Sequence, residues 1–121
     1  MRRTTPGIAM LLAALVLAGL GAACSTGSSG AAACETPTKT TEVDIQNLAF
    51  TAPCVSATAN DTLNLVNKDS AEHTFTVKGT SINVTVEGGQ TATAPLTGLA
   101  PGTYSVICQF HPQMKQTLQI T

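Results

Sequence analysis

A short stretch near the C-terminus, CQFHPQM at positions 108–114, contains three side chains that commonly bind metals. Cys108, His111 and Met114 follow one another at intervals of three residues. Each has an ordinary explanation when taken singly, because a lone Cys or Met usually fills a core and a lone His usually lies near a surface. A thiol, an imidazole and a thioether within seven residues, in a chain with only two histidines, instead indicate a metal site.

The elements that must position these side chains are strands. From about residue 41 onward, apolar and polar residues alternate with a period of two, and Gly, Pro, Asn and Asp separate the alternating segments. About eight segments have this pattern: 42–50, 53–58, 61–67, 73–78, 81–87, 90–95, 102–108 and 116–121. The pattern predicts an all-β fold, a Greek-key β-sandwich of about eight strands.

Strand geometry adds the second histidine to the candidate site. Because side chains alternate along a strand, we expect His73 to face the core from the start of one strand. We expect Cys108 to face the core from the end of another, with the loop after it folding His111 and Met114 back toward the same place. Two imidazoles, a thiolate and a weak thioether are the ligands of blue-copper sites, whereas structural zinc prefers four Cys or His ligands. The predicted cofactor is therefore one copper ion.

These residues resemble those of a known family. Residues 41–121 are similar to a bacterial cupredoxin of the plastocyanin and amicyanin type, and the Cys-x-x-His-x-x-Met spacing is that of amicyanin. The segment 67–73 resembles the one that delivers the first imidazole, and 102–108 resembles the strand that delivers the thiolate. Two positions depart from the family pattern. Gln109-Phe110 stands where Pro or Gly is frequent, and Thr74 replaces the Asn that helps to tie the two ligand loops together.

The resemblance implies a type 1 copper protein that carries single electrons between extracytoplasmic redox partners and is not an enzyme. It implies that His111 is the partly exposed ligand, with Phe110 and Pro112 giving an apolar surface on which redox partners dock transiently. The protein itself is expected to be a monomer. Two alternatives remain open: copper acquisition, storage or delivery by the same site, and a metal-free sandwich that serves as a binding module. Charged residues make up 11% of the chain and no Lys or Arg cluster follows the N-terminus, so no nucleic-acid partner is expected.

The N-terminus has the pattern of an export signal. Residues 1–23 combine two arginines with the apolar run Ile8–Leu20, which is shorter than the ~20 residues of a membrane-spanning helix. The following LGAAC resembles a bacterial lipobox, although Gly21 replaces the usual leucine. We therefore expect acylation of Cys24, a tether over residues 24–40 and a domain over 41–121, anchored by lipid to the outer face of the bacterial cytoplasmic membrane. Cleavage without lipid would give a periplasmic or secreted protein.

The cysteine count bears on the metal site. If Cys24 carries a lipid, three thiols remain, and Cys34 and Cys54, on either side of the first predicted strand, are the natural disulfide pair. Cys108 is then left for the metal. Alternatively, Cys34 stays free or pairs between molecules. Without lipidation, four cysteines could form two disulfides and consume Cys108.

Overall fold

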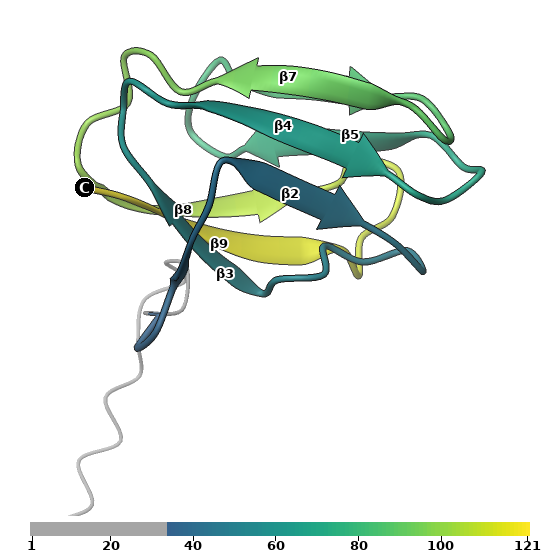
Figure 1. The fold of residues 1–121 in the computed structure, drawn as a ribbon, viewed down its shortest axis with the longest axis horizontal. Coiled ribbons are helices and arrows are strands. Elements are labelled where there is room, and N and C mark those ends of the chain that lie inside the picture. Colours follow the sequence, from purple (N-terminus) through teal and green to yellow (C-terminus); the bar gives the residue numbers. More distant parts are fainter. Residues whose placement is uncertain (1–33) are drawn as a thin grey trace, which may run out of the picture.

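The computed structural model describes residues 34–121, which form two β-sheets packed face to face (Figure 1). The predicted signal peptide and Cys24 lie outside the described residues. No segment within residues 34–121 forms a helix that could cross a membrane.

Nine strands make up the two sheets: β1 (Thr38–Lys39), β2 (Glu42–Ile45), β3 (Cys54–Ala57), β4 (Thr62–Asn67), β5 (His73–Val77), β6 (Asn83–Val86), β7 (Thr91–Pro95), β8 (Gly102–Ile107) and β9 (Lys115–Ile120). The larger sheet has the order β1-β3-β9-β8-β5-β6, and the smaller one has the order β2-β4-β7. This confirms the predicted all-β sandwich. The additional strand is β1, whose two exposed residues pair in parallel with β3 and are too few to leave a periodic pattern.

The first predicted strand, 42–50, is shorter than its sequence pattern indicated. Strand β2 ends at Ile45, and the backbone of Gln46 then exchanges two hydrogen bonds with Ala49, at 2.9 and 3.2 Å. Asn47 and Leu48 between them have φ angles of 57° and 56°, in the left-handed region that non-glycine residues seldom occupy. This turn, residues 46–49, is the first of several loops at one end of the sandwich.

The core fills the space between the sheets with alternate residues of each strand. Leu63 and Leu65 on β4 and Phe75 and Val77 on β5 have no exposed surface. The rings of Phe50 and Phe75 meet edge to face, with centroids 6.0 Å apart. Burying such side chains stabilises the fold by about 1.5–3 kcal/mol each, so the strand ends are held firmly in place.

Strands β2, β4, β6 and β8 end at the same end of the sandwich where β5, β7 and β9 begin. The loops at this end approach one another closely. A side chain at Gly88 would collide with the backbone carbonyl of Ser70, so only glycine fits there. The amide of Gly89 donates to the carbonyl of Asp69 at 2.8 Å. The loop that precedes His73 is thus fixed against the loop that follows β6.

Cys34 and Cys54 are joined by a disulfide, which links the residues before β1 to the start of β3. Within residues 34–121, Cys108 is the cysteine with a free thiol, and it is buried. The thiol predicted to bind the metal is therefore not consumed by a disulfide.

Candidate metal centre

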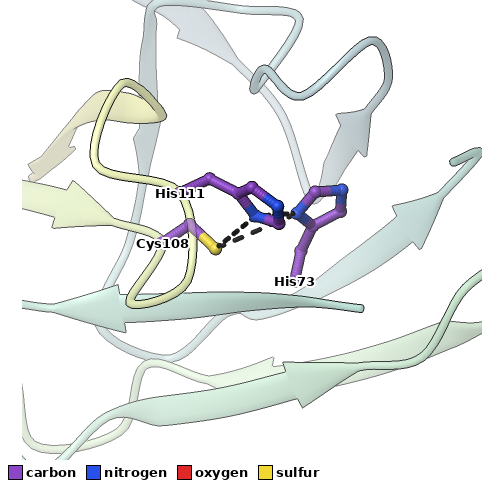
Figure 2. A group of neighbouring side chains, drawn as sticks. All are labelled: His73, Cys108 and His111. Carbon is purple, nitrogen blue, oxygen red and sulfur yellow. Dashed lines mark hydrogen bonds between the residues drawn. The ribbon is translucent and has the colours of Figure 1, made fainter. Parts of the chain in front are cut away.

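Three of the predicted donors meet at the end of the sandwich described above (Figure 2). His73 opens β5 with no exposed surface, Cys108 follows β8 with 2% of its surface exposed, and His111 lies partly exposed in the next loop. The two Nδ1 atoms are 3.1 Å apart, and Cys108 Sγ lies 3.9 Å from Nδ1 of His73 and 3.6 Å from Nδ1 of His111.

The size of this triangle suits a metal ion. Metals such as zinc lie about 2.0–2.1 Å from imidazole nitrogen and 2.3 Å from thiolate sulfur, so three donors spread evenly in a plane around one ion are about 3.5–3.8 Å apart. The observed separations of 3.1 to 3.9 Å lie around this range. Both imidazoles direct Nδ1 toward the thiol, and two imidazoles with a thiolate form a donor set suited to copper.

Met114 completes the loop that holds two of these donors. Its side chain has 1% of its surface exposed. Its amide donates to the carbonyl of His111 at 2.9 Å, and its carbonyl accepts the amide of Cys108 at 3.3 Å. The loop therefore folds back on itself, with the backbone of Met114 bound to both Cys108 and His111 and its thioether buried.

The orientation of the His73 ring is set by an acidic residue that the sequence did not reveal. Nε2 of His73 lies 3.0 Å from Oδ2 of Asp69. An ionised carboxylate only accepts hydrogen bonds, so Nε2 carries the hydrogen and the lone pair of Nδ1 points into the donor triangle. The one available signal was an acidic residue four positions before a candidate ligand, which is too common to single out Asp69.

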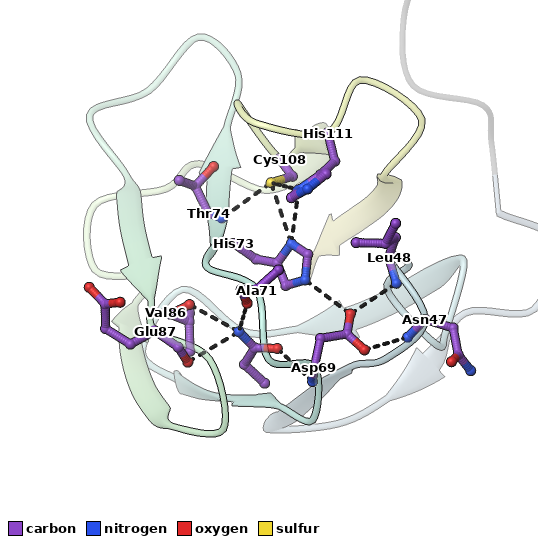
Figure 3. A network of polar contacts seen from close by, with 11 residues as sticks. Asn47, Leu48, Asp69, Ala71, His73, Thr74, Val86, Glu87, Cys108 and His111 are labelled. Carbon is purple, nitrogen blue, oxygen red and sulfur yellow. Dashed lines mark hydrogen bonds and ion pairs between the residues drawn. The ribbon is translucent and has the colours of Figure 1, made fainter.

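Asp69 also holds the turn at residues 46–49 (Figure 3). Its carboxylate accepts the amide of Asn47 at 2.7 Å and that of Leu48 at 2.9 Å, which stabilises their left-handed backbone. The hydrogen bond from Leu48 is the largest cause that lowers the pKa of Asp69, and the bonds from Asn47 and His73 act in the same direction against the opposing effect of burial. Asp69 is therefore ionised at neutral pH.

A buried amide fixes the backbone of the same loop. The side-chain nitrogen of Asn67, at the end of β4, donates to the carbonyls of Ala71, Val86 and Glu87 at 2.7 to 3.1 Å. Its oxygen accepts the amide of Asp69 at 3.0 Å. Because Asn67 is only 2% exposed, these bonds face little competition from water and hold the loop in one conformation.

Thr74, one of the two departures from the family pattern, connects the two ligand segments. Its amide donates to Cys108 Sγ at 3.3 Å, and its hydroxyl oxygen accepts the amide of Gln109 at 2.8 Å. The start of β5 and the end of β8 are therefore joined directly beside the thiol, by a threonine in the place of the family's asparagine.

Comparison with known proteins agrees with this fold. Residues 7–120 match the model of the cupredoxin-like domain family. Amicyanin from Paracoccus versutus shares the fold with 19% identity and a TM-score of 0.56, over 75% of this chain and 87% of that one. The Cu(I) form of an amicyanin mutant gives 20% identity and a TM-score of 0.56, over 76% and 90% of the two chains.

A copper-containing nitrite reductase from Thermus scotoductus matches over 71% of this chain but only 22% of its own, with 20% identity and a TM-score of 0.56. No curated protein matches in sequence. The family match spans most of the sequence, and the donors present suit copper. The chain thus belongs to the cupredoxin-like domain family. The end of the sandwich that carries His73, Cys108, His111 and Met114 supports a site for one copper ion.

Proposed function

We propose that this protein is an extracytoplasmic type 1 copper protein that carries single electrons between redox partners and is not an enzyme. Its ligands would be His73, Cys108 and His111 in one plane, with Met114 as the weak axial ligand. The observation that supports this most strongly is the convergence of two Nδ1 atoms and one Sγ within 3.1 to 3.9 Å in a cupredoxin-like domain. When bound, the copper supplies a reversible one-electron change between Cu(II) and Cu(I).

The protein's own contribution is to keep the donors still while the charge changes. Asp69 fixes the tautomer of His73, and the Thr74 amide fixes the position of the Cys108 sulfur. The backbone bonds of Met114 close the remaining loop. When the ligands stay in place as the charge changes, little energy is spent on reorganising the site, and an electron carrier needs this for fast transfer.

The surface around His111 is suited to brief docking of a redox partner. Phe110, one residue before His111, has 52% of its surface exposed, and Pro112 is also exposed. Leu48, at 41%, is the other large hydrophobic side chain exposed within residues 34–121, and its amide binds the carboxylate that holds His73. Apolar side chains near a partly exposed ligand favour weak, short-lived contact, with the electron passing through the His111 ring.

An optical titration with Cu(II) tests the proposal. The purified protein should bind one equivalent, become intensely blue or green through thiolate-to-copper charge transfer, and bleach reversibly when a reductant is added. A stoichiometric zinc protein that stays colourless when Cu(II) is supplied would contradict it.

Copper delivery by the same site is the second candidate. A surface hollow of about 480 Å³ lies against the ligand loop and is lined by Ile107, Cys108, Gln109, Pro112 and Lys115. Such a hollow would let an acceptor protein dock against the loop that carries three of the candidate ligands. Rapid electron self-exchange with retained copper favours the electron carrier, whereas fast transfer of Cu(I) to an acceptor protein favours delivery.

We also propose lipid anchoring through Cys24, with residues 24–40 as a tether whose last part is attached to the domain at 41–121 by the Cys34–Cys54 disulfide and by β1. The support is the lipobox-like LGAAC after an apolar run. Mass spectrometry of protein from the membrane fraction should find acyl chains on Cys24. Protein that begins at residue 24 without a lipid, in the soluble extracytoplasmic fraction, would support plain secretion instead.

A further inference from the structure

Four polar side chains form a closed ring beside the thiol of Cys108, on the outer face of the larger sheet. They are Thr74 and Thr76 on β5, Asn83 on β6 and Gln109 in the ligand loop. The amide of Gln109 lies 2.8 Å from the Thr74 hydroxyl, which lies 3.1 Å from the Thr76 hydroxyl. The Thr76 hydroxyl is 2.8 Å from Oδ1 of Asn83, and Nδ2 of Asn83 is 3.4 Å from Oε1 of Gln109.

The hydrogen positions in this ring follow from the chemistry of its members. A carbonyl oxygen only accepts, so the hydroxyl hydrogen of Thr76 points to Asn83. The hydrogen between the two hydroxyls therefore belongs to Thr74, which leaves a lone pair of the Thr74 oxygen free to accept the amide of Gln109. One orientation of the Asn83 side-chain amide satisfies both of its contacts: Oδ1 accepts from the Thr76 hydroxyl, and Nδ2 donates to Oε1 of Gln109.

The ring explains an unusual burial. Side chains of β5 alternate, so Thr74 and Thr76 face away from the core side on which His73 lies. Thr74 nevertheless has only 1% of its surface exposed. A buried hydroxyl without partners is costly, and Thr76 and Gln109 satisfy this one on both its donor and its acceptor side.

The ring reaches the candidate metal site through the Thr74 backbone, whose amide donates to Cys108 Sγ at 3.3 Å. Hydrogen bonds to the Cys sulfur tune the reduction potential of blue-copper sites. We propose that Thr76 and Asn83, which within residues 34–121 make no hydrogen bond to a candidate ligand, are positioning residues that hold the Thr74 amide on the thiolate sulfur. The inference rests on the proposed copper site.

The physical reason lies in the threonine itself. A single hydroxyl rotates freely and can accept from Gln109 only when its own hydrogen is directed elsewhere. Thr76 takes that hydrogen, and Asn83 in turn takes the hydrogen of Thr76. Loss of Thr76 would therefore release the Thr74 hydroxyl, loosen the tie to Gln109 and weaken the amide-to-sulfur bond. A thiolate that loses a donated hydrogen bond gives more charge to copper, which favours Cu(II) and lowers the reduction potential.

The test compares Thr76→Val, which removes the hydroxyl at nearly constant shape, with Thr76→Ser, which keeps it. In metal-free protein, the amides of Thr74 and Gln109 should exchange with solvent about five to ten times faster in Thr76→Val, the factor expected from loss of one hydrogen bond. In copper-loaded protein the reduction potential should fall. Thr76→Ser should match the wild type in both measurements. Thr93→Val, at an exposed position of β7 in the other sheet, is the control for the same chemical change.

Unchanged amide exchange and an unchanged potential in Thr76→Val would overturn the inference, as would an equal effect of Thr76→Ser. If Thr76→Val does not fold, Asn83→Ala at the exposed side of the ring gives the same test, with faster Thr74 exchange expected and unchanged exchange contradicting it. The exchange measurement needs no metal. A protein that failed to bind copper would therefore refute the proposed function while the ring was still tested.

Discussion

The two histidines of the metal centre differ in how the protein holds them. His73 has no exposed surface, and its second ring nitrogen binds Asp69, which is itself tied to the turn at residues 46–49. His111 is partly exposed, and within residues 34–121 its ring has hydrogen-bond-range contacts with the other two donors alone. The rings lie with centroids 4.7 Å apart but in very different surroundings.

The two ligand segments therefore serve different purposes. The segment that carries His73 is held by contacts from β4, β6 and the turn after β2, so it forms a rigid frame for the site. The loop that carries His111 supplies three of the four candidate ligands within seven residues and exposes Phe110 beside them. A rigid side that sets the geometry and an accessible side that meets partners are both needed by a carrier.

The largest effect is expected from replacing Cys108, whose sulfur lies close to both His73 and His111. Cys108→Ser removes the thiolate whose charge transfer to copper gives the colour, so the intense absorption should vanish even where some copper remains bound. Absorption spectra recorded after addition of one equivalent of Cu(II) measure this. A variant that kept its colour would exclude Cys108 as the thiolate ligand.

The histidines should respond differently to removal. His73→Ala opens a closed cavity and leaves Asp69 facing it, so it should destabilise the fold by about 2–5 kcal/mol, and added imidazole should not restore the spectrum. His111→Gly opens a position near the surface, so added imidazole should enter and restore the colour. Denaturation curves and imidazole titrations of both variants measure the contrast. Equal rescue of the two variants would contradict the proposed difference in accessibility.

A smaller effect is expected when only the support of His73 changes. Asp69→Asn leaves one acceptor oxygen where the carboxylate had two, so the side chain can no longer accept from Asn47 on one side and from Leu48 and His73 on the other. The hold on the tautomer of His73 is therefore weakened. Loss of such a partner typically lowers metal affinity about 10–100-fold. Loss of the negative charge should also weaken Cu(II) more than Cu(I) and raise the reduction potential.

Competition titrations of copper binding measure the affinity of Asp69→Asn, and ¹⁵N spectra of the imidazoles in metal-free protein report the tautomer directly. Asp61→Asn is the matched control. It makes the same charge change at a carboxylate that accepts a backbone amide, that of Thr58 at 2.7 Å, in the loop before β4. An equal loss of copper affinity in both variants would mean that the charge, and not the contact with His73, is responsible.

Most of the framework of the fold could be predicted because its causes are local. Alternation along a strand depends on neighbours two residues apart, and β7 and β9 lie within one residue of their predicted bounds. The turn at residues 46–49 could not be predicted, since nothing local favours a left-handed backbone at Leu48. The carboxylate of Asp69, more than twenty positions away, stabilises it.

The same distinction applies to the candidate site. The spacing of Cys108, His111 and Met114 is readable because one loop carries all three, and His73 follows from its place at the start of a strand. The roles of Asp69 and Asn67 were not found, and of the ring only Thr74 and Gln109 had been singled out, as departures from the family pattern. Their roles depend on which loops meet at the end of the sandwich, and polar residues in loops have no pattern that distinguishes a structural partner from a solvated side chain.

The smallest effect is expected at Met114, whose side chain is buried although the same loop exposes Phe110. An axial thioether binds weakly, whereas the thiolate and the imidazoles provide most of the coordination, so Met114→Leu should keep both copper and colour. Cu(II) loses a donor that Cu(I) hardly uses, and the reduction potential should therefore rise, by about 59 mV for each tenfold loss of Cu(II) affinity relative to Cu(I). Leucine has nearly the same volume, so the buried position should tolerate it with little loss of stability.

Voltammetry and absorption spectra of Met114→Leu beside Cys108→Ser separate the roles of the two residues. If Met114→Leu lost copper as completely as Cys108→Ser, or left the potential unchanged, Met114 would not be the axial ligand, and its burial would have to be explained by packing alone.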